Sequence, residues 1–303
     1  MRSSIRSLIL PLAAAALVLA AILGAMHLIL PGLARRREQQ ILGANYVIVE
    51  TDRVRLALPR LPKAPQEALA QRLAADFEGF TTALYRTYGE PLDLHPVEDR
   101  ITIRVFATHA DLVKFAGRHM KQDLSHAGGF YDPASWSIAL TLRPPRELLP
   151  VLYHEATHLI MDRSARAGSP AWSLWLAEGM AVYFEHSGVV GGRPRLGGAD
   201  RRKAAAVWAL ARQRRHIPLA QLVRGGPALF RGKLASLAYT EAGLLVAYLL
   251  EGAAGTLRQP FFRYVDLERR PGPCPPQALE ASLGVSLDTL ETDWLNFLKG
   301  AAR

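Results

Sequence analysis

The sequence predicts an α+β fold: a mixed β-sheet in the first half of the chain, followed by one central helix and a mainly helical second half. Three observations support it. Short β-branched and alternating runs lie before residue 143, apolar residues at helical spacing follow residue 146, and the pattern His-Glu-x-x-His occurs at 154–158, near the change. With 303 residues, half of them hydrophobic, the chain can bury a substantial core in one or two domains.

The N-terminal residues 1–34 are predicted to be a signal anchor, a transmembrane segment. No residue from Ser7 to Ala34 is charged, and a helix of this length can cross about 30 Å of hydrocarbon. A cleaved signal peptide is the alternative, although three arginines would then begin the mature chain. Residues 35–43 are expected to be a juxtamembrane linker. Residues 44–303 are expected to be one domain on the extracytoplasmic side, periplasmic or cell-surface, because an N-terminal anchor usually serves export.

In the first half of this domain, alternation and β-branched residues predict strands at 45–51, 101–106, 128–133 and 137–142. Apolar residues three or four positions apart predict a long helix from Ala64 to Tyr88, ended by Gly89 and Pro91. A short helix is expected around residues 111–117.

The second half is predicted to be helical, with Gly- and Pro-rich loops such as Gly188–Gly198 between the helices. Helices are expected at about 146–163, 173–186, 200–215, 236–251, 257–267 and 287–299.

The central helix carries His154-Glu155-Ala156-Thr157-His158. Residues four apart on a helix share one face, so both imidazoles and Glu155 project into one volume. Two such imidazoles can chelate Zn²⁺, and the carboxylate beside them can deprotonate a metal-activated water. The helix is expected to begin near Pro150, since proline disrupts a helix interior. The pentapeptide alone would also fit an exposed polar face carrying two histidines.

A third metal ligand is predicted at Glu178, twenty positions after His158 in the apolar run Trp172–Phe184. An unpaired carboxylate there would be costly to bury, and coordination to a cation removes that cost. Gly179 beside it is expected to let two helices approach closely across the metal. Cys274 is the single cysteine, so any metal must be held by histidines and carboxylates. Three protein ligands leave one position open, as in a catalytic zinc site with one Zn²⁺.

Together with Trp175-Leu176-Ala177-Glu178-Gly179, the motif resembles the gluzincin metallopeptidases, in particular the bacterial peptidase MA-like proteins. Three further stretches are similar to that family: Gly128–Tyr131 to its edge strand, Tyr239–Ala242 to its Tyr-bearing helix, and residues 284–298 to its final helix. The resemblance covers about residues 45–299 and implies a zincin-like fold.

The resemblance implies that His154, His158 and Glu178 bind zinc and that Glu155 is the general base. It implies that Tyr239, sixty-one positions after Glu178, stabilises the oxyanion that forms in the transition state. An ordinary core tyrosine is an equal alternative. Tyr183 is a rival donor but is expected to point away from the metal.

Two departures from the family limit what is implied. Val182 occupies the position where several gluzincins have an acid that orients the first histidine, so Glu185 or Glu241 is expected to take that role. The strand 128–132 lacks the Met-Glu-Asn element with which aminopeptidases bind a substrate N-terminus, which favours an endopeptidase. Asp132 could replace that element, but an aspartate before Pro133 is more typical of a turn.

Basic residues are concentrated between Arg193 and Lys233, called the basic segment below. It holds eleven Lys and Arg against one acid, an excess equal to the chain's net charge of +10. Such a run is usually a solvated face. The functional alternatives are contact with anionic lipid headgroups or attraction of an acidic substrate. No nucleic acid partner is expected, because the sequence contains no recognised nucleic-acid-binding motif.

The sequence therefore predicts a membrane-anchored zinc-dependent peptidase that hydrolyses peptide or protein substrates with a metal-activated water. The alternative is a catalytically inactive zinc-binding scaffold, or a binding protein of the cell envelope, on a peptidase fold. The intact Glu155 argues against the alternative, because a scaffold has no need of a base.

Overall fold

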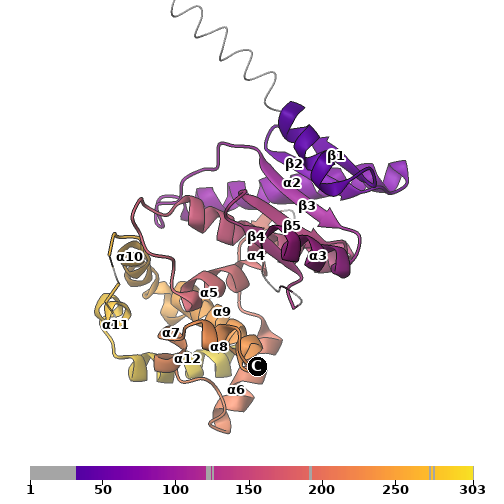
Figure 1. Cartoon of the computed structure of the whole chain (residues 1–303). Coiled ribbons are helices and arrows are strands. Elements are labelled where there is room, and N and C mark those ends of the chain that lie inside the picture. The colour runs from indigo at the N-terminus through magenta and orange to yellow at the C-terminus, as the bar shows by residue number, and fades with distance from the viewer. Residues whose placement is uncertain are drawn as a thin grey trace, which may run out of the picture.

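The computed structural model describes residues 32–120, 124, 126–190, 193–272, 274–275 and 277–302. The predicted anchor at 1–34 therefore lies almost wholly outside the described residues. Within the described part, no helix is both long enough and apolar enough to cross a membrane. The expected mixture is confirmed, since a mixed sheet occupies the first half of the domain and helices dominate the second (Figure 1).

The sheet has five strands in the order β1 (Tyr46–Glu50), β2 (Val54–Pro59), β3 (Ile101–Phe106), β5 (Ser137–Thr141) and β4 (Gly129–Asp132). The three central strands are parallel, and β1 and β4 are antiparallel edge strands. The four predicted strands are present, but β2 was not expected. It is buried on both faces, so it shows little polar alternation, and its Arg55 is accommodated by an ion pair with Glu50 at 2.5 Å.

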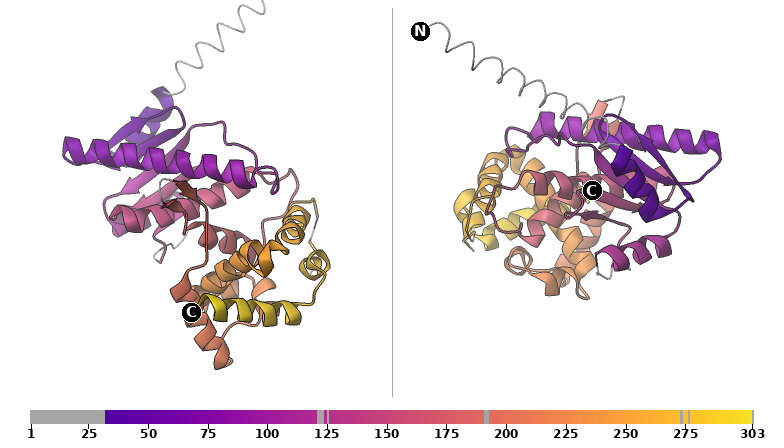
Figure 2. Two further views of the ribbon diagram at one scale, coloured as in Figure 1. Left: turned by 180° about the vertical axis from the view of Figure 1, so that it is seen from behind. Right: turned by 45° about the horizontal axis from the view of Figure 1, so that its top comes forward.

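Helices cover both faces of the sheet. The long helix α2 (Lys63–Tyr88) and the central helix α4 (Pro145–Arg163) pack on one face, and α3 (His109–His119) packs on the other. In the view from behind, α2 runs across the whole sheet (Figure 2). The apolar face of α4 is buried, with Leu152, Ala156 and Leu159 fully inaccessible.

Residues 32–42, which include most of the predicted juxtamembrane linker at 35–43, are helical. Ile41 and Leu42 pack with the α3 side of the sheet. Glu38 is buried and accepts two hydrogen bonds from the Arg104 guanidinium, at 2.8 and 2.7 Å. Arg104 lies 66 positions further along the chain, on β3, so no local pattern in the sequence indicates this ion pair.

The second half contains α5 (Leu174–Phe184), α6 (Arg201–Arg212), α7 (Leu219–Val223), α8 (Pro227–Phe230), α9 (Ala235–Glu251), α10 (Arg258–Glu268), α11 (Ala278–Leu283) and α12 (Leu287–Ala301). The six predicted helices are all present. The sequence missed α7, α8 and α11, which are too short to show a helical period. The predicted loop Gly188–Gly198 contains a small hairpin, β6 (Gly188–Val190) and β7 (Arg193–Arg195).

Helix α5 contacts both α4 and α9, and its contact with α9 is the most extensive helix pairing of the second half. Gly179 makes this possible, because a Cβ atom there would come within 2.8 Å of the Ala242 carbonyl oxygen and 2.9 Å of Val246. The glycine therefore serves the α5–α9 contact. The expectation that it would let helices approach across the metal is wrong, because the metal-facing neighbour of α5 is α4.

Candidate metal centre

The helix that carries the candidate site begins where the helical spacing predicts, next to residue 146, and not at Pro150. Helix α4 starts at Pro145, and Pro150 lies inside it, so the prediction of a start near Pro150 is wrong. A proline there removes one hydrogen bond to the carbonyl four residues back. That carbonyl belongs to Arg146, an exposed residue near the helix start, where water can satisfy it. The extra turn lets Leu148 and Leu149 join the core.

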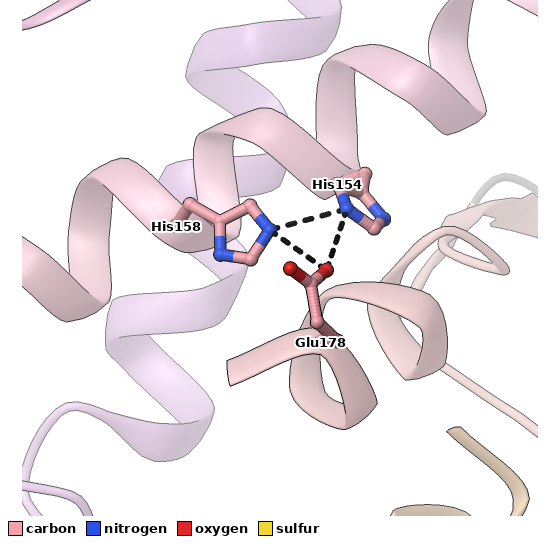
Figure 3. A group of neighbouring side chains, drawn as sticks. All are labelled: His154, His158 and Glu178. Carbon is pink, nitrogen blue, oxygen red and sulfur yellow. Dashed lines mark hydrogen bonds and ion pairs between the residues drawn. The ribbon is translucent and has the colours of Figure 1, made fainter. Parts of the chain in front are cut away.

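Three predicted ligands converge between α4 and α5 (Figure 3). One ligand atom from each of His154, His158 and Glu178 lies within 4.8 Å of the other two. The two histidine Nε2 atoms are 3.1 Å apart, and Glu178 Oε2 lies 3.4 Å from His154 Nε2 and 3.3 Å from His158 Nε2. The three side chains thus form a nearly equilateral triangle of donor atoms.

The spacing of this triangle fits zinc. Ligands bound to tetrahedral Zn²⁺ at 2.0–2.1 Å are separated from one another by about 3.3 Å, close to all three observed distances. Glu178 Oε2 is also buried without a hydrogen-bond partner among the described residues, and a metal ion would supply one. Two imidazoles and a carboxylate are the donor types that zinc prefers.

The electrostatics of the cluster also favour a cation. Burial alone would lower the pKa of His154, but Glu178 and Glu185 outweigh burial and raise it to about 10. Burial alone would raise the pKa of Glu178, but its contacts with His154 and His158 hold it well below its usual range. The pocket therefore stabilises positive charge between these side chains, whether carried by protons or by a metal.

Glu155 has the environment of a general base. Its side chain is buried beside the ligands. Burial raises the pKa of this carboxyl, while the neighbouring histidines and the backbone N–H of Tyr131 on β4 oppose the rise. A carboxylate whose pKa is moved toward neutrality can both accept and return a proton.

The carboxylate that orients His154 is Glu185, one of the two residues proposed for this role. Its Oε1 lies 2.8 Å from His154 Nδ1, the ring nitrogen that faces away from the triangle. Glu185 is the C-cap residue of α5, and Lys203 at the start of α6 approaches its other oxygen at 3.8 Å. The role expected for an acid at position 182 is thus filled from three residues further along.

Glu241, the other residue proposed to orient His154, does not do so. It is fully buried on α9, and its two oxygens accept from the backbone N–H of Ile217 at 3.2 and 3.1 Å. It therefore anchors the loop before α7.

Tyr239 on α9 lies at the candidate site. Burial and the neighbouring Glu178 and Glu155 raise the pKa of its phenol, so it stays a neutral donor at any ordinary pH.

Tyr183 points away from the candidate metal site as predicted, with its hydroxyl donating to Glu251 at 2.7 Å. Asp132 behaves as a turn residue, since it accepts from the Ala134 N–H at 3.0 Å and from Ser135.

Two features of the site were missed from the sequence. One is Lys203, whose contact with Glu185 joins segments on either side of the β6–β7 hairpin. The other is the closeness of β4 to α4: a Cβ on Gly129 would lie 2.8 Å from Val151. The glycine pair at 128–129 was visible in the sequence, but only the fold shows which helix it accommodates.

A scan against protein-family models found none that matches the chain, and a search of curated proteins found no similar sequence.

Proposed function

We propose that this chain is a zinc-dependent peptidase of the gluzincin type, with a zincin-like fold. The observation that carries the proposal is the triangle of His154, His158 and Glu178, with zinc-like spacing and the buried Glu155 beside it. Zn²⁺ bound there would lower the pKa of a water molecule and polarise a substrate carbonyl.

The chain's own residues can perform the remaining steps. Glu155 accepts a proton from the attacking water while the water oxygen bonds to the carbonyl carbon. Glu155 then gives that proton to the leaving amine nitrogen as the C–N bond breaks. Tyr239 can donate a hydrogen bond to the oxyanion that develops on the carbonyl oxygen.

The edge strand β4 supports an endopeptidase. Within the described residues β4 pairs only with β5, so its outer edge, apart from the Tyr131 N–H, offers backbone groups to an extended peptide. The N–H of Tyr131 on this strand reaches Glu155, which puts the strand next to the proposed base. A peptide lying along β4 could continue in both directions past the site, as an endopeptidase requires.

The proposal includes an N-terminal anchor and an extracytoplasmic domain. Its support is the uncharged stretch from Ser7 to Ala34. Protease protection of the domain in sealed membrane vesicles of known orientation would measure the side on which it lies. A domain accessible from the cytoplasmic side would contradict this part of the proposal.

The test of the function combines a metal assay with cleavage of a peptide library, for wild type, Glu155→Gln and Glu147→Gln. We expect about one zinc per chain in all three proteins. Cleavage should fall at least a hundredfold in Glu155→Gln and stay near wild type in Glu147→Gln, which makes the same change at an exposed position of α4. Unchanged cleavage in Glu155→Gln would refute the mechanism. Bound zinc without cleavage by wild type would favour the inactive scaffold.

A further inference from the structure

The cations of the basic segment are mostly unpaired. Elsewhere in the described part, several arginines pair with acids, as Arg104 does with Glu38 and Arg166 does with Asp93 and Asp266. Among the described lysines and arginines of the basic segment, only Lys203 has an ion pair with an acid, Glu185. Exposed cations there are Arg195, Arg201, Arg202, Arg212, Arg214, Arg215, Arg224, Arg231 and Lys233. Such a group produces a positive potential over the neighbouring surface.

Two cations of the basic segment, the paired Lys203 and the exposed Arg195, lie on the His154 side of the site. Lys203 contacts Glu185, which contacts His154. Burial lowers the pKa of the next residue, His186, and the charges of Lys203 and Arg195 lower it further. Arg195 on β7 also pairs across the hairpin with Gly188, three residues after Glu185, so both cations are close to the end of α5 beside His154.

A third cation lies on the Tyr239 side. Arg231 directly follows Phe230, whose ring packs edge-on against the Tyr239 ring with centroids 5.7 Å apart. The charge of Arg231 also acts on the Tyr239 hydroxyl, opposing the larger effects of burial and of Glu178 on its pKa. Since Arg231 is exposed, its guanidinium is available to a ligand.

The position of α6 disfavours a lipid surface as the partner. Residues 32–42 and α6 lie at opposite ends of the described part of the molecule (Figures 1 and 2). A chain anchored through its N-terminal residues would therefore hold α6 away from that membrane. The cations instead flank a site at which Glu155, Glu178 and Glu185 would otherwise repel anions.

We propose that this site selects acidic peptides, with Lys203 and Arg195 attracting carboxylates on one side of the scissile bond and Arg231 on the other. The inference rests on the proposed peptidase function and adds a substrate class to it. Negative side chains flanking the scissile bond raise the local substrate concentration and the association rate, as charge complementarity does at other interfaces.

The test uses the full chain in detergent and three sets of quenched fluorescent peptides. The sets are identical except that the flanking residues are Glu and Asp, Gln and Asn, or Lys. At about 0.05 M salt we expect kcat/KM for the acidic set to exceed that for the amide set by about tenfold, mainly through KM. The ratio should shrink at about 0.5 M salt, because screening then acts over a few ångströms.

Three variants localise the effect. Arg231→Gln and Arg195→Gln should each lower the acidic-to-amide ratio severalfold. Arg212→Gln removes the same charge about 14 Å further along α6 from Lys203 and should leave the ratio at its wild-type value. An equal loss in Arg212→Gln would show that net charge, not this placement, sets the preference, and would overturn the inference.

The remaining outcomes separate this inference from the function it rests on. Equal cleavage of acidic and amide peptides by wild type would overturn the substrate class and leave the peptidase proposal intact. Absence of cleavage for every set, with zinc bound, would overturn both. Anionic phospholipid vesicles that bind wild type but not Arg231→Gln or Arg195→Gln, with no preference among peptides, would make the segment a lipid-facing surface.

Discussion

Two carboxyl groups on adjacent, packed helices, Glu178 and Glu241, have pKa values shifted in opposite directions. Glu178 on α5 contacts two imidazoles, which hold its pKa well below the usual range. Glu241 on α9 is fully buried, and burial raises its pKa to about 8, although the backbone N–H of Ile217 opposes the rise. Burial penalises the charge of both groups, so their partners decide the outcome.

The comparison shows what distinguishes a candidate metal ligand from another buried acid. Both acids lie in apolar helices and both were candidates for the site. Glu241 has both oxygens on one N–H and needs no cation. Glu178 keeps one buried oxygen without a hydrogen-bond partner among the described residues, facing two histidines. A carboxylate oxygen without a hydrogen-bond partner, in a cluster of nitrogen ligands, therefore indicates a candidate metal site better than depth of burial does.

The largest effect is expected from Glu178→Gln. An amide at this position is a much weaker zinc ligand than a carboxylate and removes the negative charge that faces His154 and His158. Zinc affinity should fall at least a hundredfold and peptide cleavage should be lost with it. Metal content after dialysis against a chelator of known affinity, with cleavage of one peptide, measures both. Wild-type zinc retention in Glu178→Gln would refute its role as a ligand.

A third buried acid, Glu38, extends the comparison because its partner is a side-chain cation, Arg104. Glu38→Gln leaves Arg104 buried with a weaker partner, so we expect the free energy of unfolding to fall by about 3 kcal/mol or more. Urea unfolding of the full chain measures it. Glu67→Gln, an exposed position on α2, is the control and should stay within about 0.5 kcal/mol. A negligible loss in Glu38→Gln would show that the ion pair with Arg104 does not stabilise the fold.

An intermediate effect is expected from Glu185→Gln, which acts on the metal only through His154. Loss of an outer carboxylate typically weakens metal binding by about 10- to 100-fold. The same chelator competition detects this, and cleavage at saturating zinc should recover much of the wild-type rate. If Glu185→Gln binds zinc as tightly as wild type, the 2.8 Å contact does not contribute to the metal site.

Much of the fold could be predicted from the sequence because its main signals are local. Helical periodicity located α2, α4, α9 and α12 within two residues, and alternation located β3. The triangle of candidate ligands was predictable for two reasons. One helical turn places His154 and His158 on the same face, and an acid in an apolar helix is costly to bury unless it has a partner.

The features that could not be predicted from the sequence depend on contacts between segments that are far apart in the chain. Glu38 with Arg104, Glu241 with Ile217 and Lys203 with Glu185 leave no periodic mark in the sequence. The choice between Glu185 and Glu241 shows the limit: both were reasonable partners for His154, and the way α5 ends beside α4 decided between them. Likewise, the sequence located the basic charge but could not show which of its residues flank the site.

The smallest effect on the site is expected from Glu241→Gln, which completes the comparison. The folded-state pKa of Glu241, about 8, lies above the unfolded value of about 4.3. As pH rises between these values the unfolded chain releases this proton first, so wild type loses stability, by up to about 1.4 kcal/mol per pH unit. Glutamine mimics the neutral acid and cannot ionise. Urea unfolding at pH 5, 6.5 and 8 should therefore show the stability of Glu241→Gln rising relative to wild type as pH increases, with zinc content unchanged. Parallel pH profiles would mean that Glu241 is ionised in the folded protein, and the contrast with Glu178 would then disappear.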